Sequence, residues 1–285
     1  MVQIGVENVK IASYKTQYHR AGKGNDQAIL FLHGSGPGVS ALSNWEFALP
    51  ELGRKYDCIA PNLYGFGNSE HPQDPPNGVK EWLELWIEQS IELLDSLDLQ
   101  QVDLVGNSMG GAIALQLISK YPERFRKVVL MGPVGVPFKI THWLEQGWGF
   151  YRNASKELLV GCVRAFVHDP ESIGGNIEAI AEKRWDTVMN EHNKRSFQAM
   201  FSGDLQQQLD DLVVPESALK EITHSILLTH GREDKYIPLH NSLYLEQILP
   251  NAQLHVFKHC GHWIQIEKRK AFNRLLDSFF AGELD

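Results

Sequence analysis

The sequence predicts an α/β fold in which a mostly parallel sheet carries helices on both faces and a helical cap is inserted into the sheet domain. Over roughly the first 135 residues, short apolar runs that end in turns alternate with helical patterns, which is typical of a parallel sheet. From about residue 138 to residue 209 only helical periodicity is found. Strand-like runs then resume and an amphipathic helix closes the chain, so the cap interrupts one domain.

Each strand expected in the core is a short apolar run followed by a turn, as in sheets buried on both faces. These runs lie at residues 28–32, 57–60, 102–105 and 127–131 before the cap, and at 225–229 and 253–257 after it. Apolar residues at helical spacing predict helices over 82–97, 110–120 and 272–280. We expect a core of residues 1–137 and 208–285, and a cap of residues 138–207 after the sixth core strand. The aromatic residues of the cap either pack it or roof an apolar binding site, and we expect both.

Composition narrows the classes of partner. The 285 residues carry a formal charge of −8 and no basic block, so we expect no nucleic-acid partner. No run of about 18 apolar residues occurs and the first residues do not resemble a secretory signal, so we expect no membrane span and a cytoplasmic location. Three widely spaced cysteines, Cys58, Cys162 and Cys260, suit a reducing compartment. An acidic protein that binds an anion needs a local positive charge.

A glycine-flanked serine follows the strand at residues 102–105. Gly106-Asn107-Ser108-Met109-Gly110 matches G-x-S-x-G, in which a tight strand-to-helix turn exposes the serine and side chains at the glycine positions would collide with neighbouring elements. We expect Ser108 to be a nucleophile and the N–H of Met109, at the helix N-terminus, to face a developing oxyanion. The alternative is a glycine-rich turn with an exposed serine.

A second oxyanion donor is expected from HGSGPG at residues 33–38, because a glycine-rich loop lets backbone N–H groups approach a ligand. We assign this donor to the N–H of Ser35. An ordinary turn is the alternative interpretation. We expect His33 to brace the loop rather than to react.

A serine hydroxyl needs a base, and His262 lies just beyond the last predicted strand. The acid that orients it should lie between Ser108 and His262 at another strand end, where Glu233 and Asp234 are both eligible. His259 and Cys260 are neighbours of His262, but no second Cys/His cluster with ligand spacing exists, so we expect no metal.

Eight segments together carry a family resemblance that covers nearly the whole chain. They are HGSGPG at 33–38, SNW at 43–45, GNSMGG at 106–111, GPVGVPFKIT at 132–141, RW at 184–185, SFQAMF at 196–201, HGREDKYIPL at 230–239 and HVFKHCGHW at 255–263. In them the chain resembles the meta-cleavage product hydrolases, above all the branch that acts on monocyclic ring-fission products. The resemblance implies an α/β-hydrolase fold with an eight-stranded sheet. It also implies Asp234 as the acid, which leaves Glu233 to face solvent, no cofactor, and a homodimer or larger assembly.

The resemblance further implies an anionic dienoate substrate, a 2-hydroxy-6-oxohexa-2,4-dienoate with hydrogen or a small alkyl group at C6, cleaved between C5 and C6. The positions that match the family's dienoate-binding residues are Gly34, Asn44, Asn107, Arg184 and Trp263. Where members that accept a second carboxylate have a histidine, this chain has Ala112, which argues against a dioic substrate.

The C6 substituent is expected to enter a pocket lined by residues on turns after core strands or entering the cap. These are Val134, Val136, Phe138 and Ile237, whose mostly branched or aromatic side chains narrow a pocket. The alternative is that they only pack the cap onto the core.

Other interpretations stay open at this point. A guanidinium binds a carboxylate with two parallel hydrogen bonds, but Arg184 could instead pair at the surface with Asp186 or Glu182. Asn107 could merely brace its turn. The same serine site would also serve a carboxylesterase or perhydrolase, and a non-catalytic small-molecule receptor can share the fold. A dehalogenase is disfavoured because it needs an aspartate at residue 108.

Overall fold

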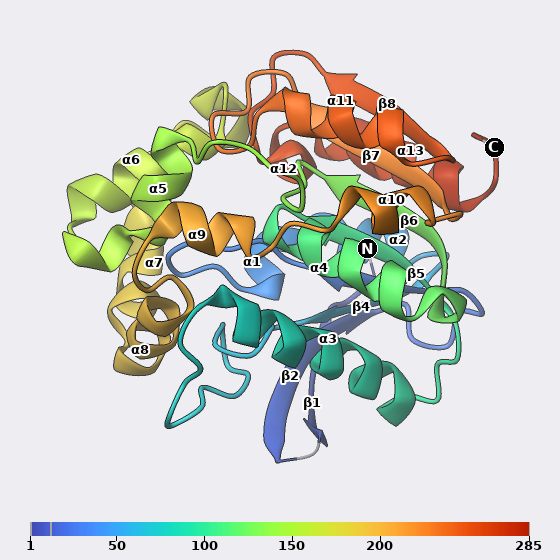
Figure 1. Cartoon of the computed structure of the whole chain (residues 1–285), viewed down its shortest axis with the longest axis horizontal. Coiled ribbons are helices and arrows are strands. Elements are labelled where there is room, and N and C mark those ends of the chain that lie inside the picture. Colours follow the sequence, from blue (N-terminus) through green and yellow to red (C-terminus); the bar gives the residue numbers. More distant parts are fainter. Residues whose placement is uncertain (1, 12, 285) are drawn as a thin grey trace.

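In the computed structural model, which describes residues 2–11 and 13–284, an eight-stranded sheet forms the centre of the molecule (Figure 1). Its strand order is β1-β2-β4-β3-β5-β6-β7-β8. The first two strands pair antiparallel, as do β2 and β4, and all later neighbours are parallel, which confirms the predicted fold class. The strands are β1 (Gly5–Ile11), β2 (Tyr14–Ala21), β3 (Ala28–Leu32), β4 (Asp57–Pro61), β5 (Val102–Asn107), β6 (Phe125–Met131), β7 (Ser225–Gly231) and β8 (Ala252–Phe257).

Successive side chains of the central strands point to opposite faces of the sheet and pack into two apolar clusters. In β3, Leu30 and Leu32 join one apolar cluster whereas Ile29 and Phe31 join the other. The first cluster is covered by α3 (Val79–Ser96), α4 (Met109–Lys120), α10 (Glu216–Lys220) and α11 (Leu239–Ile248). The second is covered by α1 (Ala41–Trp45), α2 (Leu49–Leu52), α12 (Ile264–Glu267) and α13 (Arg269–Phe280).

Besides α10, which covers the first core cluster, five helices lie between β6 and β7 and gather at one side of the sheet (Figure 1). They are α5 (His142–Trp148), α6 (Lys156–Phe166), α7 (Ile177–Met189), α8 (Glu191–Met200) and α9 (Leu205–Asp210), with short 3₁₀ turns at η2 (Phe150–Arg152) and η3 (Pro170–Ile173); a third, η1 (Pro122–Arg124), precedes β6. The limits of the cap as a domain, 138 and 207, stay a prediction.

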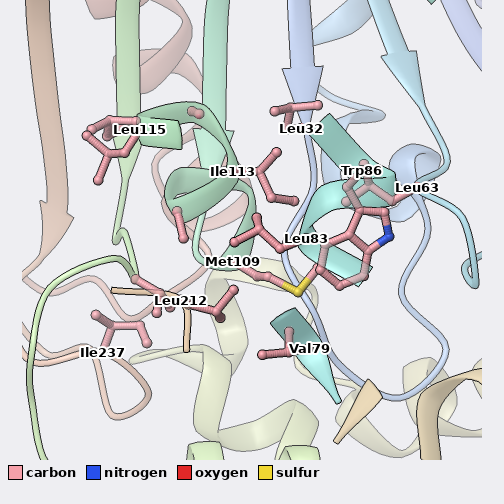
Figure 2. Packing of buried hydrophobic residues seen from close by; sticks show 14 of the residues in the cluster. Leu32, Leu63, Val79, Leu83, Trp86, Met109, Ile113, Leu115, Leu212 and Ile237 are labelled. Carbon is pink, nitrogen blue, oxygen red and sulfur yellow. The ribbon is translucent and has the colours of Figure 1, made fainter. Parts of the chain in front are cut away.

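The larger core fixes the start of α4. Figure 2 shows Met109, the first residue of that helix, among buried side chains that include Leu83 and Val79 of α3. Fully burying a side chain of this size contributes about 1.5–3 kcal/mol. Packing of Met109 therefore holds the N-terminus of α4 at the end of β5.

Across residues 2–11 and 13–284, none of the helices is long and apolar enough to cross a lipid bilayer.

Candidate active site

Ser108 connects β5 to α4 with a strained backbone. Its φ of 55° and ψ of −117° lie where non-glycine residues seldom occur, at a cost of about 1–3 kcal/mol. The turn is held because the Ser108 N–H donates to Met131 and its carbonyl accepts from Gly111 and Val134. A Cβ on Gly106 or Gly110 would collide with backbone atoms, so the two flanking glycines are required sterically.

His262 and Asp234 form a buried pair. His262 Nδ1 lies 2.6 Å from Asp234 Oδ2, while Asp234 Oδ1 accepts the N–H groups of Tyr236 and Ile237 at 2.7 and 2.9 Å. Burial opposes ionisation of Asp234, but His262 and the turn N–H groups outweigh burial and hold the pKa of Asp234 below its ordinary value. With Nδ1 donating to the carboxylate, Nε2 of His262 is left free to accept a proton.

The pair lies next to the serine turn. The Ser108 N–H bonds to the Met131 carbonyl, and a Cβ on the following residue, Gly132, would lie 3.2 Å from the His262 ring and 3.3 Å from Asp234. The strands β5, β7 and β8 thus bring Ser108, Asp234 and His262 to one edge of the sheet.

Two carboxylates hold the loop before His262. Glu233 Oε2 accepts the Cys260 N–H at 2.9 Å, and Glu267 Oε2 accepts the Gly261 N–H at 2.6 Å. The expectation that Glu233 faces solvent holds only in part: Oε1 accepts from the exposed Arg232 at 3.0 Å, whereas the backbone N–H of Cys260 holds Oε2 on the loop. Glu267 also accepts from His168 and Asp169 through Oε1, so it ties this loop to the cap.

The HGSGPG loop lies directly against the serine. A Cβ on Gly34 would be 3.0 Å from Ser108 Cβ, so a larger residue there would crowd the serine turn. The Gly34 N–H donates to Asn44 Oδ1, whereas the N–H groups of Ser35 and Met109 have no acceptor among the described residues. Those two N–H groups are therefore free to bind an oxyanion, which the expected oxyanion-binding role of Ser35 and Met109 requires.

His33 braces this loop. Its Nδ1 donates to the Gly34 carbonyl at 2.7 Å and its Nε2 accepts the Leu63 N–H at 3.0 Å. Complete burial lowers the pKa of His33 to about 4, so the ring is neutral.

Two buried amides next to the serine keep unused polar atoms. Asn44 Oδ1 accepts from both Gly34 and Asn107 Nδ2, at 3.0 Å each. Among the described residues, Asn44 Nδ2 and Asn107 Oδ1 have no partner. Because an unpaired buried polar atom costs about 1–3 kcal/mol, these two atoms point to a polar ligand. Asn107 does brace its turn, as the alternative holds, but bracing leaves its oxygen unsatisfied.

Arg184 of α7 is recessed rather than paired at the surface. Within the described parts of the chain it forms no ion pair with Asp186 or Glu182, and Glu182 binds Lys156 at 2.8 Å instead. Its guanidinium carbon lies 4.9 Å from the centre of the Trp263 ring. Burial lowers the pKa of Arg184 to about 10, with Glu46 opposing the shift, so Arg184 is a cation at neutral pH.

A column of stacked groups links Arg184 to His262. Tyr236 stacks on Phe166 at 4.0 Å, and Phe166 stacks on Trp263 at 4.7 Å, while Phe166 and Tyr236 both lie within 5.7 Å of the His262 ring. Sequence reasoning missed Phe166 and Tyr236. It also missed Trp148, whose Nε1 donates to Ser35 Oγ at 2.7 Å.

The expected C6 pocket residues lie in the core cluster. Val134, Val136 and Ile237 are buried and Phe138 is half-buried against the same cluster. These positions are compatible both with lining the C6 pocket and with only packing the cap onto the core.

No group of three or more His, Cys, Asp or Glu side chains in the described residues could hold a metal ion. Cys58, Cys162 and Cys260 are buried free thiols, and burial raises the pKa of Cys162 to about 11. They are therefore poor nucleophiles.

The chain is similar to known hydrolases over nearly all of its length. The family described as alpha/beta hydrolase fold matches residues 27–269. A 2-hydroxymuconate semialdehyde hydrolase from a Pseudomonas species is 40% identical over 98% of this chain and 94% of the relative. A 2-hydroxy-6-oxo-2,4-heptadienoate hydrolase from Pseudomonas putida is 38% identical over 94% of each chain.

A solved structure agrees with these relatives. A serine hydrolase from the polyaromatic-hydrocarbon-degrading bacterium Cycloclasticus zankles matches with a TM-score of 0.97 and 48% identity, over 99% of this chain and 100% of that one. The chain therefore belongs to the α/β-hydrolase family and, within it, to the meta-cleavage product hydrolases.

Proposed function

We propose that this enzyme hydrolyses the C5–C6 bond of 2-hydroxy-6-oxohexa-2,4-dienoates with a small C6 substituent, and that Ser108, His262 and Asp234 perform the reaction. The products are 2-hydroxypenta-2,4-dienoate and a carboxylic acid. The observation that carries the proposal is the meeting of three features: the strained Ser108 turn, the 2.6 Å Asp234–His262 pair, and two unsatisfied amide atoms beside them.

The dienol must first become a ketone, with the 2-hydroxyl losing a proton and C5 gaining one. Ser108 Oγ then bonds to the C6 carbonyl carbon while His262 Nε2 takes the hydroxyl proton. Negative charge develops on the carbonyl oxygen, and the N–H groups of Ser35 and Met109 stabilise it. Asp234 keeps the Nδ1 proton in place and stabilises the imidazolium.

Collapse of this intermediate breaks the C5–C6 bond. The bonding electrons pass through the conjugated chain to the C2 oxygen, which takes the proton from His262, and the dienoate leaves. A water molecule then attacks the Ser108 ester with His262 as base, which releases the carboxylic acid and restores the hydroxyl. No cofactor is needed for this balance.

The dienoate end requires groups that suit a carboxylate and an enol oxygen. Arg184 supplies a recessed cation, and the free amide atoms of Asn44 and Asn107 supply one donor and one acceptor. Trp263, held flat against Phe166, offers an aromatic face to a conjugated chain. The N–H of Gly34 already donates to Asn44, so Gly34 would contact the substrate without a hydrogen bond from that N–H.

Two observations support a small C6 substituent. Val134, Val136 and Ile237 are buried in one apolar cluster, and if they line the C6 pocket their branched side chains narrow it. Relatives named for the semialdehyde and the heptadienoate share 40% and 38% identity with this chain, against 33% for a 2-hydroxy-6-oxo-6-phenylhexa-2,4-dienoate hydrolase from Burkholderia cepacia.

A spectrophotometric assay tests the proposal. The coloured dienols with methyl or phenyl at C6 are mixed with wild type, Ser108→Ala and, as a matched serine control, the exposed Ser96→Ala. Wild type and Ser96→Ala should bleach the methyl dienol, with a kcat/KM about tenfold or more above that for phenyl. Ser108→Ala should lose several orders of magnitude, and adding His262→Ala should cost little more because the residues act together. Bleaching by Ser108→Ala at the wild-type rate would refute the nucleophile, and a preference for phenyl would refute the substrate size.

A further inference from the structure

A cationic groove of about 780 Å³ runs along the face where the cap meets α12 and α13. Its lining side chains come from both parts, α7 and η3 on the cap side and α1, α12 and α13 on the core side. The basic ones are Lys183, Arg184, Lys268, Arg269, Lys270 and Arg274, and we call these six the basic groove.

The basic groove is not neutralised by its own carboxylates. Only Glu46 and Glu267 line it, and the oxygens of Glu267 already accept three backbone N–H groups. In the described residues, none of the six cations forms an ion pair. The adjoining cavity shares Arg269, Lys270 and Arg274 with the groove, but its other two cations are neutralised, Lys55 by Asp277 and Arg54 by Glu51.

This concentration contrasts with the rest of the chain. The protein has 27 Lys and Arg against 35 Asp and Glu, so its overall field repels an anion. Six of the basic residues nevertheless line one groove with two acidic ones. A concave surface of one sign focuses the field and raises the local concentration of an oppositely charged ligand.

The basic groove reaches residues that adjoin the candidate active site. Arg184 and Trp263 line it, and Trp263 directly follows His262. Arg184 also packs on the serine-side loop, since a Cβ on Gly38 would lie 3.6 Å from Arg184 Cβ. Arg184 is therefore the one cation of the set that belongs both to the groove and to the wall of the buried site.

We infer that the basic groove is the entrance that collects anionic substrates and delivers their carboxylate to Arg184. The occupant is a conjugated monocarboxylate in transit, so this inference rests on the proposed function. Ser108 and His262 are only 4% and 3% exposed, so a substrate must pass between cap and core to reach them. The basic groove lies at this cap–core boundary, and in the proposed path Arg184 stands at its inner end.

The test is the salt dependence of kcat/KM for the methyl dienoate. The groove variant is Lys268→Gln/Lys270→Gln/Arg274→Gln, which leaves Arg184 intact. The control variant, Lys10→Gln/Lys15→Gln/Lys80→Gln, removes the same charge from β1, β2 and α3. All six side chains are exposed except that of Lys268, which is half-buried, and thermal unfolding would check that each variant folds as wild type does.

At low ionic strength we expect the groove variant to lose roughly three- to tenfold in kcat/KM, through KM rather than kcat. This loss relative to wild type and to the control variant should vanish as salt shortens the Debye length, so that wild type and groove variant converge near 0.5 M, on the order of a 4 Å screening length. Hydrolysis of neutral nitrophenyl acetate should be the same in all three proteins.

Equal salt dependence in the groove and control variants would overturn the entrance while leaving the proposed function intact. A loss on the neutral ester as large as that on the dienoate would overturn it too, because charge would then not be the cause. Failure of wild type to cleave any dienoate would instead refute the proposed function.

Discussion

Replacing Asp234 with asparagine separates two effects that its carboxylate has on His262. Oδ1 accepts two turn N–H groups and Oδ2 faces His262 Nδ1 at 2.6 Å. In Asp234→Asn the amide oxygen should stay with the turn, because otherwise two buried N–H groups lose their acceptor. The new NH₂ group must then point at Nδ1 and force the imidazole proton onto Nε2.

This geometry sets the size of the loss. A weakened charge-assisted hydrogen bond alone, about 1.5–3 kcal/mol, would lower kcat by roughly 10- to 150-fold. A wrong tautomer removes the base altogether, and for the serine protease triad that costs about 10⁴. We therefore expect kcat for Asp234→Asn to fall by about 10³–10⁴ near neutral pH.

Steady-state bleaching of the methyl dienol, with thermal unfolding as a folding check, measures this effect. Glu233→Gln is the matched control, since its carboxylate holds the Cys260 N–H and not the imidazole. We expect the control to lose less than about tenfold. A kcat for Asp234→Asn within tenfold of wild type, or a larger loss in Glu233→Gln, would refute the assignment of the acid.

Three further predictions concern the surroundings of the site. First, because burial lowers the pKa of His33 to about 4, below the unfolded value near 6.5, its contribution to stability is complete above about pH 6.5 and is lost as the pH falls toward about 4. The free energy of unfolding should drop by about 2 kcal/mol more in wild type than in His33→Gln between about pH 7 and pH 5, and parallel pH profiles in denaturant titrations would contradict this. Second, Ile237→Ala should raise kcat/KM for the phenyl relative to the methyl dienol by about tenfold, whereas a change in thermal stability alone would leave Ile237 as core packing. Third, Glu267→Gln places an amide NH₂ against a backbone N–H of Gly261 or of the cap, so kcat should fall by about tenfold with little change in KM; an unchanged kcat with a lower Tm would mean that Glu267 is only structural.

The parts of the fold that sequence predicts well are those with local causes. Glycine at 106 is dictated by contact with Gly110 in the same turn, and glycine at 110 by contact with the end of the neighbouring strand β3, so their spacing indicates the turn. The buried parallel strand β3 is a continuous apolar run, and β5 is apolar apart from Asp103, Gly106 and Asn107, so sequence analysis located both. It assigned no strand to the first 27 residues, although β1 and β2 form a hairpin there, because Thr16, Gln17 and His19 are buried polar residues that break the apolar pattern.

Cap-to-core contacts are what sequence could not supply. The Trp148–Ser35 hydrogen bond joins residues 113 apart, and no local pattern encodes it. Arg184 illustrates the same limit, since nearby acidic residues favoured a surface pair until tertiary packing placed its guanidinium against Trp263. Glu233 was misjudged in part for a related reason, because Oε2 of its carboxylate accepts the N–H of Cys260 on another loop.

The stacked column beside His262 constrains how this enzyme could be re-engineered. Its members alternate in origin: Tyr236 and Trp263 belong to the core, whereas Phe166 and Arg184 belong to cap helices α6 and α7. A chimera that received the cap of another hydrolase would therefore exchange every second group in the column, including the Phe166 ring that packs on the His262 imidazole. Cap exchange intended to alter selectivity would need to carry matched residues at 236 and 263, or the graft would shift the His262 ring as well as change the cap side of the site.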